Sequence, residues 1–179
     1  MYQEETHLFA LWRILWSFDQ IFAKGAFDMK IIFLDIDGVM NSDVFEYQNS
    51  IGRITDPYCL EKLRDIMDST GAEIVLTSSY RFGWSYYENA SFGSGKVLHR
   101  EFSNAGITIY DKTPNLFSGR AEEIKSWLED NPDAEEFVII DDITFGWGDL
   151  DRFVVKTSPH EGRGLEDIHV SMAVNILNA

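Results

Sequence analysis

The chain of 179 residues has little cysteine and few basic residues. Its single cysteine, Cys59, cannot form an internal disulfide, which fits a reducing compartment and predicts a cytoplasmic protein. No C-x-x-C or H-E-x-x-H pattern indicates a zinc site. The chain has 15 basic and 30 acidic residues. Its net charge of -15 argues against broad, non-specific binding to nucleic acid or to an anionic membrane.

A long, uninterrupted apolar run is also missing. Residues 8–27 are rich in Leu, Ile, Trp and Phe, but charged residues interrupt them, so they form a poor transmembrane span. No basic segment precedes them, as a signal peptide requires. Because the polar positions recur at helical spacing, we expect an amphipathic helical extension over residues 1–28, which packs on its own domain or forms a homodimer interface through residues 8–27. An interfacial membrane helix is the alternative, and Met29 is an alternative start of the chain.

The rest of the chain alternates apolar runs with amphipathic stretches. Apolar runs predict strands at the start of 30–39 and over 72–76, 106–110, 136–140 and 153–155. Amphipathic stripes predict helices over 57–70, 121–128 and 165–177, the first between an Asp-Pro start and a Gly stop. The segment 41–55 is predicted to be a loop or a short hairpin flap. The segment 82–105 is predicted to be a loop and a helix stabilised by buried aromatic rings, with a base-stacking platform as the alternative.

This alternation predicts a doubly wound, parallel α/β sheet in one domain over residues 29–179. The ligands of such sheets bind outside the carboxyl ends of the strands. The first strand delivers Asp35 and Asp37 to that edge, and Gly38 then permits a sharp turn or the close approach of a ligand. Period-2 geometry points both carboxylates to one side if the strand stays extended, and a cation or a shared proton would relieve their repulsion. A solvated strand end is the alternative for this stretch taken alone.

Other predicted strand ends and helix starts supply the remaining groups of a phosphoryl-transfer site. Thr77 and Ser78 follow the second strand, where their hydroxyls and backbone N–H groups suit an anion. A cation at the start of the next helix, Arg120, or one turn further on, Lys125, can offset charge on phosphoryl oxygens. An acidic pair after the fourth strand can join Asp35 in binding a hard cation such as Mg²⁺.

Three motifs resemble those of the haloacid dehalogenase (HAD) superfamily. L-D-I-D-G-V, V-L-T-S-S and V-I-I-D-D each follow an apolar run and are similar to motifs I, II and IV of that group. The resemblance covers residues 30–177 and implies a Rossmannoid sheet of order 3-2-1-4-5 and Mg²⁺-dependent hydrolysis of a phosphate ester. It implies Asp35 as nucleophile and Asp37 as general acid/base. It also implies that the metal is bound by the Asp35 carboxylate, the main-chain oxygen of Asp37 and the Asp142 carboxylate. Asp141 would lie behind Asp142 or bind the metal through water.

The third motif departs from the usual pattern, because the family normally places a lysine there. Arg120 has the position and Lys125 has the chemistry, and we favour Arg120 because arginine at a helix start is a good phosphate ligand. There is no room for a separate cap domain in 41–56 or 81–106, so we expect an open site. The candidate substrate contacts lie beside the motifs: Gly38, Asn41, Ser79 and Arg81. For Asn41 and Arg81 the alternative is that they support the site residues from behind.

A finer resemblance is to the HAD domains called Swiss Army Knife RNA-repair-like. It is carried by D-I-D-G-V-M-N, T-S-S-Y-R, G-R-A-E-E-I-K-S-W-L and the late V-K-T-S-P…G-L, and it implies a nucleic-acid end phosphate as substrate. The net charge of -15 speaks against such a substrate. The alternatives are a small-molecule phosphatase, nucleotidase or phosphotransferase, a phosphorylation-dependent switch, and a non-catalytic HAD-like binding module.

Overall fold

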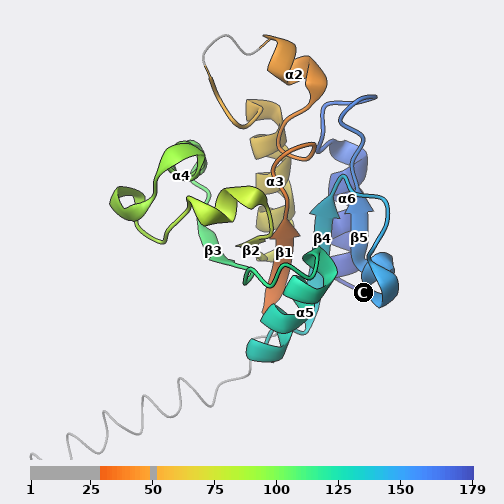
Figure 1. Ribbon diagram of the computed structural model, residues 1–179. Coiled ribbons are helices and arrows are strands. Elements are labelled where there is room, and N and C mark those ends of the chain that lie inside the picture. The colour runs from red at the N-terminus through yellow and green to blue at the C-terminus, as the bar shows by residue number, and fades with distance from the viewer. Residues whose placement is uncertain (1–28, 49–51) are drawn as a thin grey trace, which may run out of the picture.

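The apolar run after Met29 forms β1 (Lys30–Leu34), the central strand of the sheet (Figure 1). This computed structural model describes residues 29–48 and 52–179. All five strands are parallel, in the order β3-β2-β1-β4-β5, which confirms the predicted topology. The other strands are β2 (Glu73–Leu76), β3 (Ile109–Lys112), β4 (Glu136–Asp141) and β5 (Val154–Lys156). The predicted helical extension over 1–28, with its interface over 8–27, lies outside the described residues.

Helices cover both faces of the sheet (Figure 1). α3 (Pro57–Thr70) and α6 (Asp167–Leu177) pack on one face together with α4 (Gly93–Asn104). α5 (Arg120–Asp130) packs on the other face. The shorter helical elements are α2 (Asp43–Gln48) and the 3₁₀ turns η1 (Ser79–Phe82), η2 (Glu88–Ala90) and η3 (Gly148–Phe153).

The side chains of β1 alternate between the two cores. Ile32 and Leu34 join the cluster under α3 and α6, whereas Ile31 and Phe33 join the cluster under α5. Phe33 meets the ring of Trp127 edge to face at 5.4 Å. Both faces are buried, which is why the strand is apolar at every position after Lys30. Each of these side chains contributes about 1.5–3 kcal/mol by burial, so the strand that carries the site is firmly fixed.

The predicted ends of α3 are confirmed. Asp56 caps the helix by accepting a hydrogen bond from the Tyr58 amide at 2.9 Å, and Pro57 occupies the first turn. Gly71 ends the helix with a φ of 72°, a left-handed conformation that glycine adopts without a steric cost.

Two local predictions differ from the structure. The segment 41–55 is not a simple loop or hairpin flap, because it contains α2, whose first turn is held by a bond from the Phe45 amide to the Ser42 hydroxyl. The third strand begins at Ile109 rather than near 106. The reason is that Gly106, with a φ of 71°, and the bond from the Ile107 amide to the carbonyl of Phe102 prolong the end of α4.

The connections at the carboxyl edge contain only short elements. In the described part of the chain, α2 lies between β1 and α3, and η1, η2 and α4 lie between β2 and β3, with no separate cap domain. Over residues 29–48 and 52–179, no helix has both the length and the apolar character needed to cross a membrane.

Candidate active site

The loop after β1 carries two aspartates in different environments. The Asp35 amide donates to the carbonyl of Ile140 at 3.0 Å, so pairing with β4 continues one residue beyond the strand. The chain then turns, with the Met40 amide bonded to the Ile36 carbonyl at 2.8 Å. Asp35 is consequently 2% exposed, whereas Asp37 is exposed to solvent. The strand therefore does not stay extended through Asp37, which was the condition for both carboxylates to point to one side.

A cluster of three carboxylates lies at the carboxyl ends of β1 and β4. One oxygen from each of Asp35, Asp141 and Asp142 lies within 4.8 Å of the others. Burial raises the pKa of Asp141 to about 6, with the Asp35 charge adding to this and the Arg120 charge opposing it. Burial and the charge of Asp35 also raise the pKa of Asp142. The charge of Asp35 adds to the effect of burial on both pKa values, and a bound cation would relieve this repulsion.

The oxygen atoms of this cluster fit a hard cation. Asp35 Oδ1 is buried and has no hydrogen-bond partner within the described part of the chain. All the candidate ligands are oxygens, which Mg²⁺ prefers. Gly38 allows the loop to approach Asp142 closely, because a Cβ at this position would lie 2.5 Å from Asp142 Oδ2, and its φ of 78° is left-handed. The backbone conformation and the close approach to Asp142 therefore explain a glycine at position 38 without any contact with substrate.

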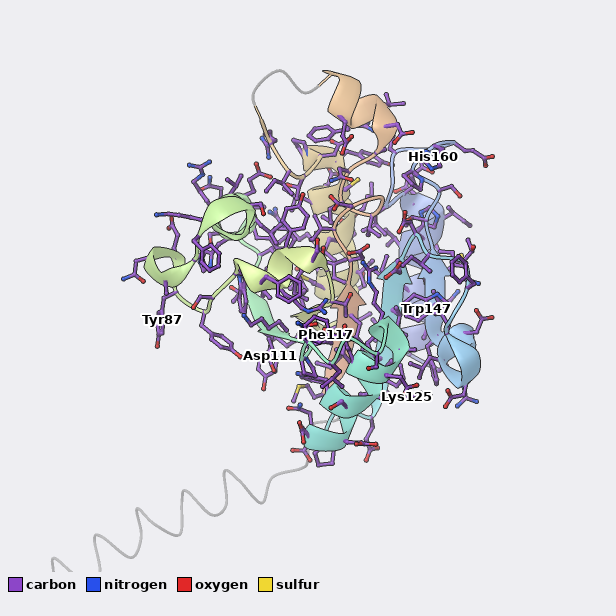
Figure 2. The ribbon with its side chains drawn as sticks, in the orientation of Figure 1. Tyr87, Asp111, Phe117, Lys125, Trp147 and His160 are labelled. Atoms are coloured by element: carbon purple, nitrogen blue, oxygen red, sulfur yellow. The ribbon has the colours of Figure 1, made fainter. Side chains whose placement is uncertain are left out.

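Arg120, the first residue of α5, lies beside this cluster. Its guanidinium pairs with Asp35 Oδ2 at 2.7 Å and also with Asp141. Burial acts to lower the pKa of Arg120, but the charges of these two carboxylates raise it by more. Lys125 lies further along α5 (Figure 2) and pairs with Asp149 at 2.8 Å and with Glu122 at 3.3 Å. The structure therefore brings Arg120, and not Lys125, to the carboxylates.

The loop after β2 presents two buried hydroxyls. The Thr77 amide donates to the Leu34 carbonyl at 2.9 Å, which keeps this loop beside the end of β1. Thr77 and Ser78 are each 1% exposed, and neither hydroxyl has a hydrogen-bond partner among residues 29–48 and 52–179. Buried polar groups are normally paired, so these two hydroxyls point to a ligand. Ser79, the first residue of η1, is exposed.

Asn41 contacts Asp37 rather than standing free for substrate. It is buried, and its Nδ2 donates to Asp37 Oδ1 at 3.2 Å and to the Ile54 carbonyl at 3.0 Å. Its Oδ1 accepts from the Gly38 amide at 2.9 Å. Tyr80, which the sequence analysis missed, donates its hydroxyl to the same Asp37 oxygen at 3.2 Å. Burial, with the Asp37 charge, raises the pKa of Tyr80 to about 12, so the phenol remains a donor.

Arg81 is also turned inward. It is buried, and its guanidinium contacts the carbonyl of Thr77 and the carboxylate of Glu123. Glu123 is a second residue that the sequence analysis missed. Its position in the charged stretch R-A-E-E-I-K is typical of a solvated helix face, and nothing in the spacing marks it as buried.

A five-stranded parallel sheet of this order, with an acidic cluster at its carboxyl edge, is consistent with a HAD-like Rossmannoid fold. The family model for the HAD domain in Swiss Army Knife RNA repair proteins matches residues 31–170, and the chain belongs to this family. Comparisons with curated proteins and with solved structures give no match. Membership in the family indicates a phosphatase-type function, and the three-carboxylate cluster fits a metal site.

Proposed function

We propose that the protein is a Mg²⁺-dependent phosphate monoester hydrolase that acts through an aspartyl-phosphate on Asp35. One observation carries this proposal. Asp35 has one oxygen held by Arg120 at 2.7 Å and a second buried oxygen without a partner in the described residues. A carboxylate fixed in this way is oriented for in-line attack without rearrangement.

The proposed reaction has two steps. In the first, Asp35 attacks phosphorus, the bond from phosphorus to the ester oxygen breaks, and Asp37 gives its proton to that oxygen. In the second, water attacks phosphorus, Asp37 takes a proton from the water, and the bond to Asp35 breaks. A single residue serves as acid and then as base, which suits the exposed position of Asp37.

The other residues stabilise charge on the phosphoryl oxygens. Thr77 and Ser78 would donate their hydroxyls to these oxygens, and Arg120 would offset their negative charge. Mg²⁺, held by Asp35, Asp142, the main-chain oxygen of Asp37 and, directly or through water, Asp141, would neutralise further charge on the transferred group.

We further propose a nucleic-acid end phosphate as the substrate. Two phenylalanines that lie close to site residues in the sequence are strongly exposed: Phe117 (91%), three residues before Arg120, and Phe145 (80%), three residues after Asp142. Exposed aromatic rings suit stacking against unpaired bases. The absence of a cap domain among the described residues and the description of the family support the same class. Recognition of an end, rather than of a long charged backbone, is compatible with a net charge of -15.

A phosphatase screen with and without Mg²⁺ tests this proposal. The panel contains oligonucleotides with 3′- or 5′-phosphates, mononucleotides, sugar phosphates and an aryl phosphate, with Asp35→Asn as the control for contaminating activity. We expect Mg²⁺-dependent turnover with a preference for oligonucleotide ends. Preference for a small metabolite would instead support a small-molecule phosphatase or nucleotidase, and absence of turnover on every substrate would support a binding module.

A further inference from the structure

A buried ion pair joins the loop after β2 to α5. The guanidinium of Arg81 lies 2.8 Å from Glu123 Oε2, and the two side chains are 10% and 5% exposed. Removing two charges from water opposes folding, and apolar pairs of similar size often stabilise a protein as well or better. Stability alone is therefore a weak reason for a charged pair at this position.

On one side, the pair holds the backbone of the hydroxyl-bearing loop. A second nitrogen of Arg81 donates to the carbonyl of Thr77 at 2.5 Å and to the carbonyl of Ser78 at 3.3 Å. These are the two residues whose buried hydroxyls lack partners in the described part of the chain. Lys112, at the end of β3, adds a bond from its ammonium to the Arg81 carbonyl at 3.0 Å. The loop is thus held through its carbonyls, which leaves its hydroxyls free to bind a ligand.

On the other side, the pair holds the start of α5. Glu123 lies three residues after Arg120, and its amide donates to the Gly119 carbonyl at 3.1 Å in the first turn of the helix. Its second oxygen, Oε1, accepts from the Leu116 amide at 3.1 Å. Glu123 therefore connects Arg81 both to the helix that begins with Arg120 and to the loop that precedes it.

We infer that Arg81 and Glu123 are positioning residues that set the distance between the Thr77 and Ser78 hydroxyls and the Arg120 guanidinium. We assign neither residue a contact with the substrate, because both side chains are buried and bonded to protein groups. Both residues hold segments whose groups would bind the same phosphoryl oxygens: the Thr77 and Ser78 hydroxyls in one segment and the Arg120 guanidinium in the other. The inference rests on the proposed function for its catalytic consequence, but the mechanical coupling between the two loops does not depend on that function.

Apolar replacement separates positioning from stability. Arg81→Met alone leaves the Glu123 charge buried and unpaired, so it lowers the melting temperature. The double variant Arg81→Met/Glu123→Leu removes both charges and is expected to recover much of that loss. Neither variant can hold the Thr77 and Ser78 carbonyls, and the double variant also loses the bond from the Leu116 amide to Glu123. Arg163→Met is the matched control, because it breaks an arginine pair of 2.7 Å with Asp56 at the start of α3.

The measurements are the dissociation constant of inorganic phosphate with Mg²⁺, by calorimetry, and amide hydrogen exchange over 77–81 and 113–119. We expect phosphate affinity at least about tenfold weaker in both Arg81 variants, including the double variant with its recovered melting temperature, and unchanged affinity in Arg163→Met. A double variant that regains affinity together with stability would overturn the inference.

Hydrogen exchange keeps this test distinct from a failure of the proposed function. Arg81→Met is expected to speed exchange in 113–119 as well as in 77–81, because the Arg81 side chain pairs with Glu123, which accepts from the Leu116 amide. If the wild-type protein binds no phosphate, the proposed function fails, and exchange alone then decides the coupling. Faster exchange in 77–81 with no change in 113–119 would refute it.

Discussion

The two aspartates of the first motif are two residues apart, yet they lie in opposite surroundings. Asp35 is buried, paired with Arg120 and close to two further carboxylates. Asp37 is exposed and accepts hydrogen bonds from Asn41 and Tyr80. Different environments are how one site assigns different roles to similar groups. The buried carboxylate suits attack along a fixed line, and the exposed one suits proton exchange with the leaving group and water.

The largest effect is expected from Asp35→Asn. An amide cannot form the aspartyl-phosphate, so we expect turnover to fall by about 10³-fold or more on every substrate. Steady-state kinetics on an aryl phosphate would measure this, and the melting temperature would check that the fold is retained. Activity within tenfold of wild type would rule out Asp35 as the nucleophile.

Asp37→Asn is expected to have an effect that depends on the leaving group. General acid catalysis contributes about 10²–10⁴-fold, and the contribution shrinks when the leaving oxygen is a weak base. The loss should therefore be larger for an alkyl phosphate or an oligonucleotide end than for a nitrophenyl phosphate. Equal losses on both kinds of substrate would show that Asp37 does not protonate the leaving group.

Arg120 is the cationic side chain that pairs with the buried Asp35. Arg120→Met removes the charge next to Asp35 and Asp141, and we expect a loss of about 10²-fold in kcat/KM. Lys125→Met is the matched change on the same helix, where the amine pairs with Asp149 and Glu122, and it should leave activity within about twofold of wild type. The opposite ranking would restore the usual lysine role to Lys125.

A smaller effect is expected from Asn41→Ala, which acts on the exposed carboxylate only. It removes the bond to Asp37 and leaves the Gly38 amide and the Ile54 carbonyl without this partner. Loss of one orienting bond corresponds to about tenfold in kcat, with KM little changed. If KM rises while kcat is kept, Asn41 instead acts as a substrate contact, as the sequence had suggested.

The smallest expected effect is a change in melting temperature with pH and Mg²⁺ that depends on Asp141. The pKa of Asp141 is raised from 3.8 to about 6, so in the metal-free protein its favourable contribution is present at low pH and is lost as the pH rises through about 6. The melting temperature of the wild type relative to Asp141→Asn should therefore fall between pH 5 and pH 7.5 without Mg²⁺. Added Mg²⁺ should raise the melting temperature more at the higher pH, because the ligands must be deprotonated. An equal Mg²⁺ effect at both pH values would argue against a carboxylate site.

The sheet was predictable because buried parallel strands leave a strong mark in the sequence. The apolar runs before Asp35, Thr77 and Asp141 are continuous since helices cover both faces, and their order followed from the motifs. α2 was not predicted, because six residues are too few for an apolar stripe. The third strand was placed too early, because an apolar run does not show that the left-handed Gly106 and the bond from the Ile107 amide to the Phe102 carbonyl prolong the end of α4.

In the site, the sequence indicated which loops matter but not how their charges pair. Arg120 and Lys125 differ in the structure because α5 turns them to different neighbours, and sequence position alone could only favour one of them. Arg81 and Asn41 were predicted either to support the site residues from behind or to contact substrate, because they follow motifs closely. Arg81 is bonded to Glu123, 42 residues further along the chain, and Asn41 to the Ile54 carbonyl, 13 residues further along, and local patterns do not reveal such contacts.

The most direct test of the account is to trap the covalent intermediate. Wild-type protein is mixed with Mg²⁺ and a good substrate, quenched in acid within a turnover, digested, and mapped by mass spectrometry. The account predicts one phosphoryl group on the peptide that contains Asp35, absent from Asp35→Asn and accumulating further in Asp37→Asn with an aryl phosphate. Efficient turnover in the wild type with no phosphoryl group on Asp35 at any quench time would contradict it.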